Sequence, residues 1–433
     1  MHRIVIVGGG AGGLELATRL GDKLGRAGKA HITLIDRSPT HVWKPLLHEV
    51  AAGSLDAHVH QIEFAAQAHW HHFNFVRGEL KGLDRSSKTI DIATVHGGAF
   101  DDKAEILPSR KVEYDTLVLA LGSRTHFFGV HGAEEHAITL DTLEQAEILR
   151  RRLLATCARK RTAGGNDDVN IAIIGGGATG VELAAELRRM EAGFRKYGLH
   201  PNGKSGDIKI SLLEAGHRLL PALPERVGQT ASSILSELGI EVSVADPVIE
   251  VADGRIQTKS GRAITSDITI WAAGIKAPGV LASLDGLAVN RINQLKVGRT
   301  LQSETDVDIF AIGDCASCSW NGERMVPPRA QAAHQQAVYL SKALVSRLEC
   351  RVSDEFSYSD HGSLVSLGPS AAVGSLLHNS TGGYIFVKGT FAKLLYATLY
   401  RKHLAAVSTL NRACASLIIH AIRRLTMPRV KLH

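Results

Sequence analysis

The sequence predicts an α/β fold with two Rossmann-like dinucleotide-binding domains and a distinct C-terminal region. The pattern Gly-x-Gly-x-x-Gly occurs at 8–13 and again at 175–180. Each copy follows a short β-branched run and precedes a stretch rich in Leu, Ala and Glu, which is the order strand, tight turn and helix. A basic tail without acidic residues after Asp360 sets the C-terminal region apart.

The two glycine-rich turns are typical of dinucleotide binding. Backbone N–H groups of such a turn approach a pyrophosphate, and the helix that follows offers its positive N-terminus. Glycine is needed where a Cβ would collide with the phosphates or the helix. One such motif is a weak signal, whereas two in the right context are a strong one. The glycines expected to act in this way are Gly8, Gly10, Gly13, Gly175, Gly177 and Gly180.

An acidic residue ends the next strand after each glycine-rich helix. Asp36 closes the apolar run 30–36, and Glu214 closes the run 208–214. A carboxylate at this position accepts hydrogen bonds from ribose hydroxyls and repels a 2′-phosphate, which favours NADH over NADPH. Arg218 is a counter-signal, although it lies further along the chain than a phosphate clamp is expected to lie.

Length and composition indicate a globular protein of two or three domains. The chain has 433 residues, of which 44% are hydrophobic and 21% charged. The net charge of +7 is concentrated near the C-terminus, which points to an anionic surface. The first strand is expected to begin at the first residues of the sequence, so no signal peptide is expected. Five cysteines, odd in number, are expected to be thiols in a reducing compartment.

The first half of the chain continues the α/β pattern. Residues 39–53 read as a loop that enters a helix, at the place where such folds meet a flavin ring; the alternative is a linker with a buried tryptophan. The segments 74–78 and 88–92 alternate as strands do. The run 112–123, which ends at Gly122, predicts one central parallel strand.

The second half repeats the first. Residues 141–160 have a helical pattern, and the polar stretch 162–168 is a credible domain boundary. The strand 267–274 returns to a glycine, and 308–314 predicts a buried strand that ends at Asp314, over the ligand crevice. A helix follows Pro328; its small residues would let a flat ligand approach, and its amides can bind carbonyl oxygens.

The tail from His403 onward predicts an amphipathic helix. No run approaches about 18 apolar residues, so the tail is not expected to span a membrane. A basic amphipathic helix is typical of a membrane interface, and the alternative is a helix packed on the body of the protein. The apolar face comprises Val407, Leu410, Cys414, Leu417, Ile418, Ala421 and Leu425.

Taken together, these motifs resemble the membrane-associated type II NADH dehydrogenases, single-subunit flavoproteins that pass electrons from NADH to quinone. They belong among the pyridine nucleotide-disulfide reductase-like flavoproteins with the two-domain fold of glutathione reductase. The pattern Ala-Gln-x-Ala-x-Gln at 330–335 matches the quinone signature of the family and is the most specific match. The other matching segments are 8–17, 43–51, 175–187, 212–216, 271–274 and 311–316.

The resemblance implies roles for individual residues. Glu182, Gln331 and Gln335 match catalytic positions: Glu182 near the nicotinamide, the glutamines beside the quinone. The FAD-binding positions would be Gly8, Gly10, Ala11, Gly13, Asp36, Lys44, Ala120, Gly122, Asp314, Ala330 and Gln331. The NADH-binding positions would be Gly175, Gly177, Gly180, Glu182, Glu214 and Gly274.

The resemblance also implies an organisation and a reaction. FAD would be bound by residues 1–140 and 291–360, NADH by an inserted domain at 141–290, and lipid by an anchoring region at 361–433. A hydride would pass from NADH to FAD, and two electrons would then reduce a membrane quinone of the respiratory chain without proton pumping. The expected location is peripheral, on the cytoplasmic face of the inner (plasma) membrane, with a homodimer as the expected assembly.

Two other functions remain open at this stage. A sulfide:quinone oxidoreductase would need a pair of reactive cysteines; Cys315 and Cys318 have redox-motif spacing, but they follow the strand that ends at Asp314. An NADH-binding flavoprotein redox sensor or adaptor would use the tail to hold DNA or lipid. The hydrophobic positions of the tail favour lipid, so no nucleic-acid partner is expected.

A cluster of histidines raises the question of a metal. His69, His71 and His72 stand close together, but no carboxylate or cysteine stands at ligand spacing from them. We therefore predict surface histidines and no metal site.

Overall fold

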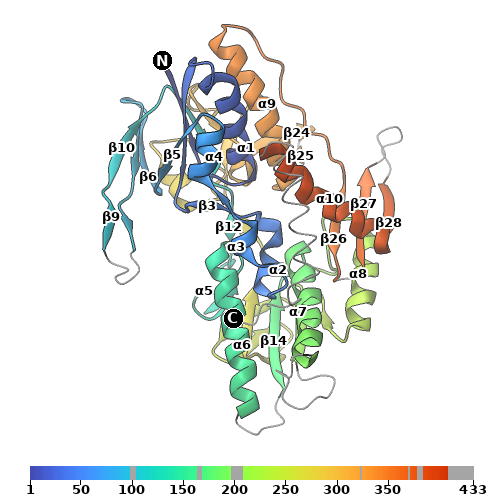
Figure 1. Cartoon of the computed structure of the whole chain (residues 1–433). Helices are drawn as coiled ribbons and strands as arrows, with labels where there is room; N and C mark the ends of the chain where they lie inside the picture. Colours follow the sequence, from blue (N-terminus) through green and yellow to red (C-terminus); the bar gives the residue numbers. More distant parts are fainter. Residues whose placement is uncertain are drawn as a thin grey trace. The chain divides into compact units, whose positions relative to one another are not determined.

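The computed structural model describes residues 1–97, 104–162, 168–196, 208–321, 324–368, 371–377 and 384–407 (Figure 1). The described chain forms two compact units. The first contains Met1–Trp43, His60–Arg124 and Lys276–Ser359. The second contains Lys44–Val59, Thr125–Ile275 and the described residues from Asp360 to Val407.

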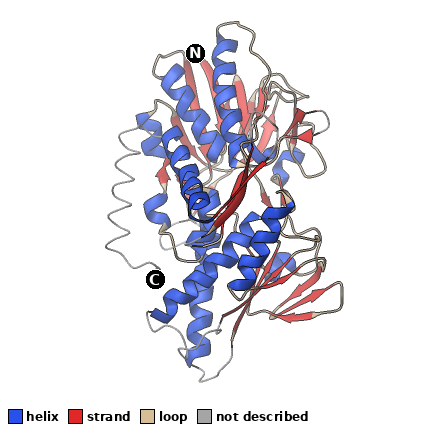
Figure 2. Ribbon diagram, turned by 90° about the vertical axis from the view of Figure 1, so that its right-hand side faces the viewer, coloured by secondary structure: helices blue, strands red, loops and turns tan. Residues whose placement is uncertain are grey.

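The first unit is built on a five-stranded parallel sheet with the strand order β23-β11-β1-β2-β5. Helices α1 and α9 pack against each other, and α4 packs against β5. Figure 2 shows the helices of the structure in blue and the strands in red. Two smaller sheets, β10-β7-β6 and β22-β24-β25, complete this unit together with short strand pairs. Its helices and strands are β1 His2–Val7, α1 Ala11–Leu20, η1 Gly21–Gly25, β2 Ala30–Asp36, β3 Thr40–His41, β4 Ile62–Glu63, α4 Phe64–Trp70, β5 Asn74–Arg77, β6 Leu80–Asp84, β7 Thr89–Ile92, β8 Val95–His96, β9 Glu105–Leu107, β10 Arg110–Glu113, β11 Thr116–Leu119, η3 Gly279–Ser283, β22 Leu295–Val297, β23 Ile309–Ala311, η4 Gly313–Cys315, β24 Ala316–Asn321, β25 Arg324–Met325 and α9 Ala330–Leu348.

The second unit repeats this plan with the parallel order β13-β20-β14-β15-β16. Helices α6 and α7 pack against β14, and the antiparallel sheets β17-β18-β19 and β26-β27-β28 are added. Its elements are η2 Lys44–Leu46, α2 Leu47–Ala51, α5 Ala133–His136, β13 Ile138–Thr139, α6 Leu143–Thr162, β14 Val169–Ile174, α7 Ala178–Lys196, β15 Ile208–Leu213, α8 Glu225–Glu237, β16 Glu241–Ser243, β17 Val248–Ala252, β18 Arg255–Thr258, β19 Ala263–Thr265, β20 Ile268–Trp271, β26 Ser363–Ser366, β27 Ala372–Leu377, β28 Tyr384–Lys388 and α10 Gly389–Val407. Three short elements, α3 Ala57–His60, β12 Arg124–Thr125 and β21 Ile275–Lys276, fall where the chain passes between the segments of the two units.

The strand that precedes each glycine-rich turn is the centre of its sheet. The last four residues of β1 and of β14 are buried, because a central parallel strand is covered on both faces. β2 ends at Asp36 and β15 ends directly before Glu214, and each lies on one side of the central strand of its sheet. β11 and β20, which lead to Gly122 and Gly274, lie on the other side. The predicted fold of two Rossmann-like units is therefore confirmed.

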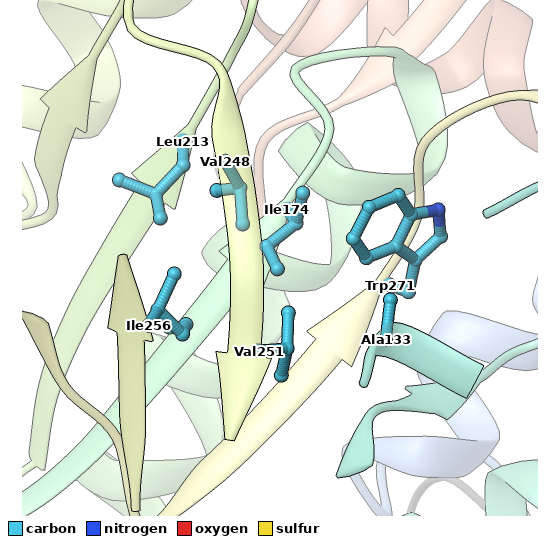
Figure 3. Packing of buried hydrophobic residues seen from close by; sticks show 8 residues of the cluster. Ala133, Ile174, Leu213, Val248, Val251, Ile256 and Trp271 are labelled. Atoms are coloured by element: carbon cyan, nitrogen blue, oxygen red, sulfur yellow. The ribbon is translucent and has the colours of Figure 1, made fainter. Parts of the chain in front are cut away.

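A core cluster of the second unit lies between its parallel sheet and the sheet β17-β18-β19. Figure 3 shows Trp271 of β20 and Ile174 of β14 with Val251 and Ile256 of the smaller sheet and Ala133 of α5. These side chains are almost fully buried. Burial of this apolar surface fixes the end of β20, where a ligand crevice is expected.

The run 112–123 was predicted to be one strand, and this prediction is wrong. The run contains the end of β10, which pairs antiparallel with β7, and then β11, which lies in the parallel sheet. Asp115 lies between them, and its carboxylate accepts hydrogen bonds from the backbone N–H (2.8 Å) and the Nε–H (3.1 Å) of Arg3. These contacts hold the chain at the point where it leaves one sheet for the other.

The limits of the compact units differ from the expected domains. Residues 44–59 pack with the second unit, because α2 contacts α6 and α7. Residues 125–140 and the described residues after Asp360 belong to the same unit, since β26 packs against α7 and α10 packs against β26, β27 and β28. The assignment of FAD and NADH to the two units stays a prediction.

The structure contains several of the predicted helices and strands. The helix expected at 141–160 is α6, and the strands expected at 30–36, 74–78 and 208–214 are β2, β5 and β15. The polar boundary at 163–167 lies outside the described residues. So does the tail helix after Val407, with Leu410, Cys414, Leu417, Ile418, Ala421 and Leu425.

Candidate active site

The first glycine turn joins β1 to α1. Gly8 has φ +107°, and a Cβ there would lie 2.3 Å from the carbonyl oxygen of Ala120. A Cβ on Gly13 would lie 1.8 Å from the carbonyl oxygen of Gly8. A Cβ on Gly10 would meet no atom within 4 Å, and Ala11 then begins the helix. Contacts within the protein require glycine at 8 and 13, whereas no protein atom fills the space next to Gly10.

The second glycine turn, between β14 and α7, has the same geometry. A Cβ on Gly175, which has φ +117°, would lie 2.7 Å from the backbone of Ala272. A Cβ on Gly180 would lie 2.0 Å from the carbonyl oxygen of Gly175, and a Cβ on Gly177 would meet nothing within 4 Å. Each turn therefore offers a free space at a helix N-terminus, which fits the pyrophosphate of a dinucleotide.

The two acidic residues brace these turns. Asp36 accepts hydrogen bonds from the backbone N–H of Gly9 (2.6 Å) and of Ser38 (2.8 Å). Glu214 accepts them from Gly176 (2.6 Å) and Gly216 (2.7 Å) in the same way. Burial raises the pKa of Asp36 above its usual value. Each carboxylate keeps further lone pairs that can accept ribose hydroxyls.

Arg218 is held by its own loop. Its guanidinium donates hydrogen bonds to the carbonyl oxygens of Leu223 (2.9 Å), Pro221 (2.8 Å) and Leu220 (3.3 Å). Donors that are engaged in this way are not directed at a 2′-phosphate. The structure thus removes the counter-signal to NADH that the sequence contained.

The strand returns are the turns that follow β11 and β20 and contain Gly122 and Gly274. Both glycines have a left-handed backbone, with φ +66°. Ala120, just before the first return, donates its N–H to Val7 (2.8 Å), and its carbonyl is the atom that Gly8 must avoid. At the second return a Cβ on Gly274 would lie 2.3 Å from the ring of Phe128. The returns therefore line the carboxyl ends of the sheets, where ligands bind in such folds.

Asp314 lies in η4, directly after β23. Its carboxylate accepts a hydrogen bond from the Ser123 hydroxyl (2.7 Å), and its carbonyl accepts one from the Gln294 amide (2.8 Å). The N–H of Gly313 donates to Gln336 Oε1 at 2.7 Å. Gln336 is buried and was missed by the sequence interpretation, in which only the spacing of the neighbouring signature glutamines was informative.

Helix α9 presents Gln331 and Gln335 together. Both side-chain amides donate to the carbonyl oxygen of Ser359, at 2.9 and 2.7 Å, and Gln335 also accepts the N–H of Ser359 at 2.9 Å. Residues four apart lie on one face of a helix, which explains the shared partner. Ala330 is the first residue of α9, and Ala333 approaches Gly12 of α1.

A buried polar cluster surrounds Glu182 on α7. Its carboxylate accepts a hydrogen bond from the N–H of Ser366 (3.0 Å) and one from the Tyr396 hydroxyl. Nδ1 of His48 lies 3.6 Å from Glu182 Oε2. Burial raises the pKa of Glu182 to about 8 and lowers the pKa of His48 to about 4. At neutral pH a neutral histidine therefore lies beside a largely protonated carboxyl group.

His48 was not among the predicted site residues. It is 2% exposed, and its Nε2 has no hydrogen-bond partner among the described residues. The ring reaches Glu182 because α2 packs against α7, a contact between distant segments that no local pattern reveals.

Comparison with known proteins identifies the family. Residues 2–337 match the family Pyridine nucleotide-disulphide oxidoreductase. A type II NADH:quinone oxidoreductase from Haemophilus influenzae is 40% identical over 450 residues, which cover 100% of both chains. A protein of the same name from Staphylococcus haemolyticus is 30% identical over 86% of this chain and 89% of its own. The chain belongs to the type II NADH:quinone oxidoreductase family. It is accordingly a flavoprotein enzyme with FAD and NADH as cofactors, and it transfers electrons from NADH to quinone.

Solved structures show the same fold. The structure of NDH2 from Plasmodium falciparum in complex with NADH matches with a TM-score of 0.83 at 20% identity, covering 100% of this chain and 99% of that one. The sulfide:quinone oxidoreductase of Aquifex aeolicus matches with a TM-score of 0.72 at 18% identity, covering 99% and 96%. Both comparisons support the fold of the type II NADH:quinone oxidoreductase family and leave the chemistry to the site residues.

The cysteines of this family member lie in apolar surroundings. Cys315 and Cys318 are buried and free, and burial raises their pKa values to about 12 and about 11. The Cys315 thiol contacts the carbonyl oxygens of Leu119 and Ile312. Thiols with raised pKa are poor nucleophiles, so this pair does not have the features of a reactive disulfide centre.

Lys44 and His71 each lie beside an aspartate. Lys44, expected to bind FAD, lies in the second unit and forms an ion pair with Asp141 at 3.1 Å. In the histidine cluster, His69 and His72 are exposed, but His71 is buried, so the prediction of surface histidines is wrong for His71. Its Nδ1 lies 3.0 Å from Asp22. The described part of the chain contains no group of three or more His, Cys, Asp or Glu residues that could hold a metal ion.

Proposed function

We propose that this member of the family passes a hydride from NADH to FAD, reduces a membrane quinone and translocates no protons. The observation that carries the proposal is the pair of matched glycine turns, each with a free space at a helix N-terminus beside a carboxylate. The unit that contains the first turn also contains Asp314 and the side-chain amides of α9, which suit a flavin and a quinone. The second is suited to NADH.

Individual residues then have distinct roles. When bound, FAD supplies a ring that takes up a hydride and gives up electrons in steps. Asp36 would accept hydroxyls of its adenosine ribose, and Asp314, oriented by Ser123, would accept hydroxyls of the ribitol chain. Glu214 would hold the ribose of NADH in the second unit, near the free space at Gly177.

The glutamines of α9 would recognise the quinone. A side-chain amide has two N–H donors, and Gln331 and Gln335 each use one on Ser359. The second donor of each can bind a quinone carbonyl oxygen. Ser359 fixes the rotamers of both glutamines, so their donors are oriented before a substrate arrives.

Glu182 would hold a proton for the reaction. Quinone reduction consumes two protons, and a carboxyl group with a pKa of about 8 is protonated at neutral pH and can release its proton. The Tyr396 hydroxyl and the N–H of Ser366 stabilise the anion that remains. This arrangement fits a group that gives and regains a proton in each turnover.

A surface of the second unit supports attachment to lipid. Phe391 and Leu394 of α10 are 60% and 59% exposed, and Ile385 of β28 is also exposed. The same two elements carry exposed cations: Lys388 ends β28, and Arg401 and Lys402 lie in α10. Apolar side chains beside cations are typical of proteins that bind anionic lipid surfaces. No helix within the described ranges is long and apolar enough to cross a membrane. We place the protein at the cytoplasmic face of the inner (plasma) membrane, as a homodimer, from its resemblance to the family.

A single-turnover experiment tests the function. The purified holoenzyme is mixed anaerobically with NADH and then with a soluble quinone, and the flavin absorbance is followed. We expect bleaching by NADH and rapid recovery with quinone. If the flavin bleaches but quinone does not restore its absorbance, the acceptor is a different one and a sensor role becomes the better explanation. Sulfide in place of NADH should leave the flavin oxidised, because the buried thiols have raised pKa values and are poor nucleophiles.

Proton translocation and attachment need separate measurements. In proteoliposomes that contain quinone, turnover should move no protons from one compartment to the other. The only pH change should come from the protons that quinone reduction itself takes up. Sedimentation with anionic vesicles should fall as salt rises and fall further in Phe391→Ser. A generated membrane potential, or binding that is indifferent to lipid charge and to Phe391, would contradict these parts of the proposal.

A further inference from the structure

Phe128 combines two unfavourable features. It is a large apolar residue that is 61% exposed, and its backbone has φ +54°, in the left-handed region. A side chain with a Cβ rarely adopts that conformation, and such a residue persists only where its surroundings impose it. Exposure means that burial of the ring in the protein does not compensate the strain.

The surroundings do impose this conformation. Before it, Phe127 packs against the buried Trp271, with ring centroids 5.6 Å apart. The N–H of His126 donates to the carbonyl of Gly274 (3.2 Å), and Trp271 Nε1 donates to the carbonyl of His126 (3.1 Å). After it, Val130 packs on the same core cluster, the one that Figure 3 shows around Trp271. Both neighbours are anchored in the core, so Phe128 projects outward between them.

The ring of Phe128 lies against the return at Gly274. A Cβ at position 274 would come within 2.3 Å of two ring carbons, so this glycine is needed to let the ring approach. The ring of His126 packs beside it at a centroid distance of 4.3 Å. An aromatic surface is therefore fixed at the carboxyl end of β20.

The direction of a bound dinucleotide follows from the sheet order. Glu214, directly after β15, would hold the adenosine ribose, and the turn after β14 would hold the pyrophosphate. Strand β20 is next to β14 on the side away from β15. The half of NADH that carries the nicotinamide must then extend over the end of β20, toward Gly274 and Phe128.

Resting on the proposed function, we propose that Phe128 binds the nicotinamide half of NADH. Its exposed face packs against the nicotinamide ring and excludes water from it, which accounts for a strained aromatic residue at this place. Nothing in the adenosine half depends on this contact. Loss of the ring is therefore expected to weaken the binding of NAD⁺ and NADH and to spare ligands that end at the second ribose.

Binding of two ligands to the holoenzyme tests this proposal. NAD⁺ contains the nicotinamide ring, and ADP-ribose lacks it. In Phe128→Asn the ring is removed while the left-handed backbone is tolerated, and in Phe128→Tyr a ring is kept. By calorimetry we expect the Kd of NAD⁺ to rise about tenfold in Phe128→Asn, in line with aromatic stacking on a base. The Kd of ADP-ribose should stay within about twofold, and Phe128→Tyr should resemble the wild type for both ligands.

Controls separate this role from a structural one. The melting temperature of Phe128→Asn should equal or exceed that of the wild type, because an exposed ring is lost and strain is relieved. Ile249→Thr, which removes another exposed apolar side chain of the same unit, should leave both affinities unchanged. Equal weakening of NAD⁺ and ADP-ribose, or no weakening of either, would overturn the proposal. Because no turnover is needed, a failure of the wild type to reduce quinone would count against the proposed function and leave this comparison intact.

Discussion

Replacing Glu182 with glutamine removes a carboxyl group that the fold keeps largely protonated at neutral pH. Burial raises its pKa from the ordinary 4.5 to about 8. The native protein thus binds a proton that the unfolded chain releases as pH rises between these values. The contribution of this group to stability is fully present below about pH 4.5 and is lost progressively as pH rises to about 8.

The size of the effect follows from the width of that window. Each pKa unit corresponds to about 1.4 kcal/mol, so the loss is on the order of 5 kcal/mol across the window, as an upper limit. For a chain of 433 residues this slope corresponds to about 1.5 °C of melting temperature per pH unit. Glutamine does not titrate and keeps an oxygen that can accept from Ser366. The variant should therefore gain melting temperature relative to the wild type as pH rises, and the gain should level off above about pH 8.

The assay is a series of melting curves for the wild-type and Glu182→Gln holoenzymes from pH 5 to pH 9. Tyr396→Phe supplies a companion variant, because it removes a donor to the anion and should move the levelling point to higher pH. A difference between wild type and Glu182→Gln that stays constant over the whole range would refute the reasoning. It would show that the carboxyl group ionises normally in the folded protein.

The same substitution should separate the two half-reactions. Glu182→Gln cannot release a proton, so quinone should reoxidise the flavin about 100-fold more slowly, the lower end for general acid catalysis. Reduction by NADH should change less, since a hydride carries no proton demand. Rapid-mixing absorbance measures both steps in one sample. If only the NADH step slowed, Glu182 would act in nucleotide binding instead.

Four further substitutions probe the remaining residues of the site. Cys315→Ser should keep NADH:quinone turnover within about twofold, and the wild-type thiol should resist alkylation in the folded protein, because it is buried with a raised pKa; rapid labelling with loss of activity would contradict this. Glu214→Ala should raise the NADPH-to-NADH ratio of kcat/KM by about tenfold, whereas Arg218→Ala should leave that ratio unchanged, since its donors bind loop carbonyls; steady-state kinetics with both nucleotides checks this. Gln335→Ala should raise the KM for quinone by up to about tenfold with an unchanged KM for NADH, as expected for one lost hydrogen bond; an equal rise in both would indicate a general disturbance of α9.

The sequence was sufficient for features that depend on local sterics. A Cβ on Gly13 or Gly180 would collide with the carbonyl oxygen of Gly8 or Gly175 in the same turn, so the motif itself determines the geometry. The strand ends at Asp36 and Glu214 were likewise predicted from a local pattern, an apolar run that closes at an acidic residue. Features that depend on contacts between distant segments could not be read in this way. Arg3 and Asp115 meet only because β1 and β11 are neighbours, and their contact lies where the run 112–123 divides into two strands.

Site residues show the same division. Gln331 and Gln335 were accessible because a helix places residues four apart on one face. Gln336, one residue further, points instead to Gly313, and only the packing of α9 against η4 makes it part of the site. His48 and Phe128 depend likewise on which elements pack together. A polar or aromatic residue becomes informative there through burial, a missing partner or a strained backbone, none of which is written in the local pattern.

Asp36 and Glu214 each have two roles that cannot be told apart from the sequence alone. Their position at the end of a strand indicates contact with a ribose, and the structure shows that both also hold an N–H of the neighbouring glycine turn. The carboxylate that would bind the ligand therefore also shapes the space for its phosphates. A substitution at either position removes the ribose acceptor and releases the turn at once, so a loss of affinity there does not measure the ribose contact alone. The ratio between the kcat/KM values for NADPH and NADH does measure the local charge at Glu214, because the released turn weakens the binding of both nucleotides alike.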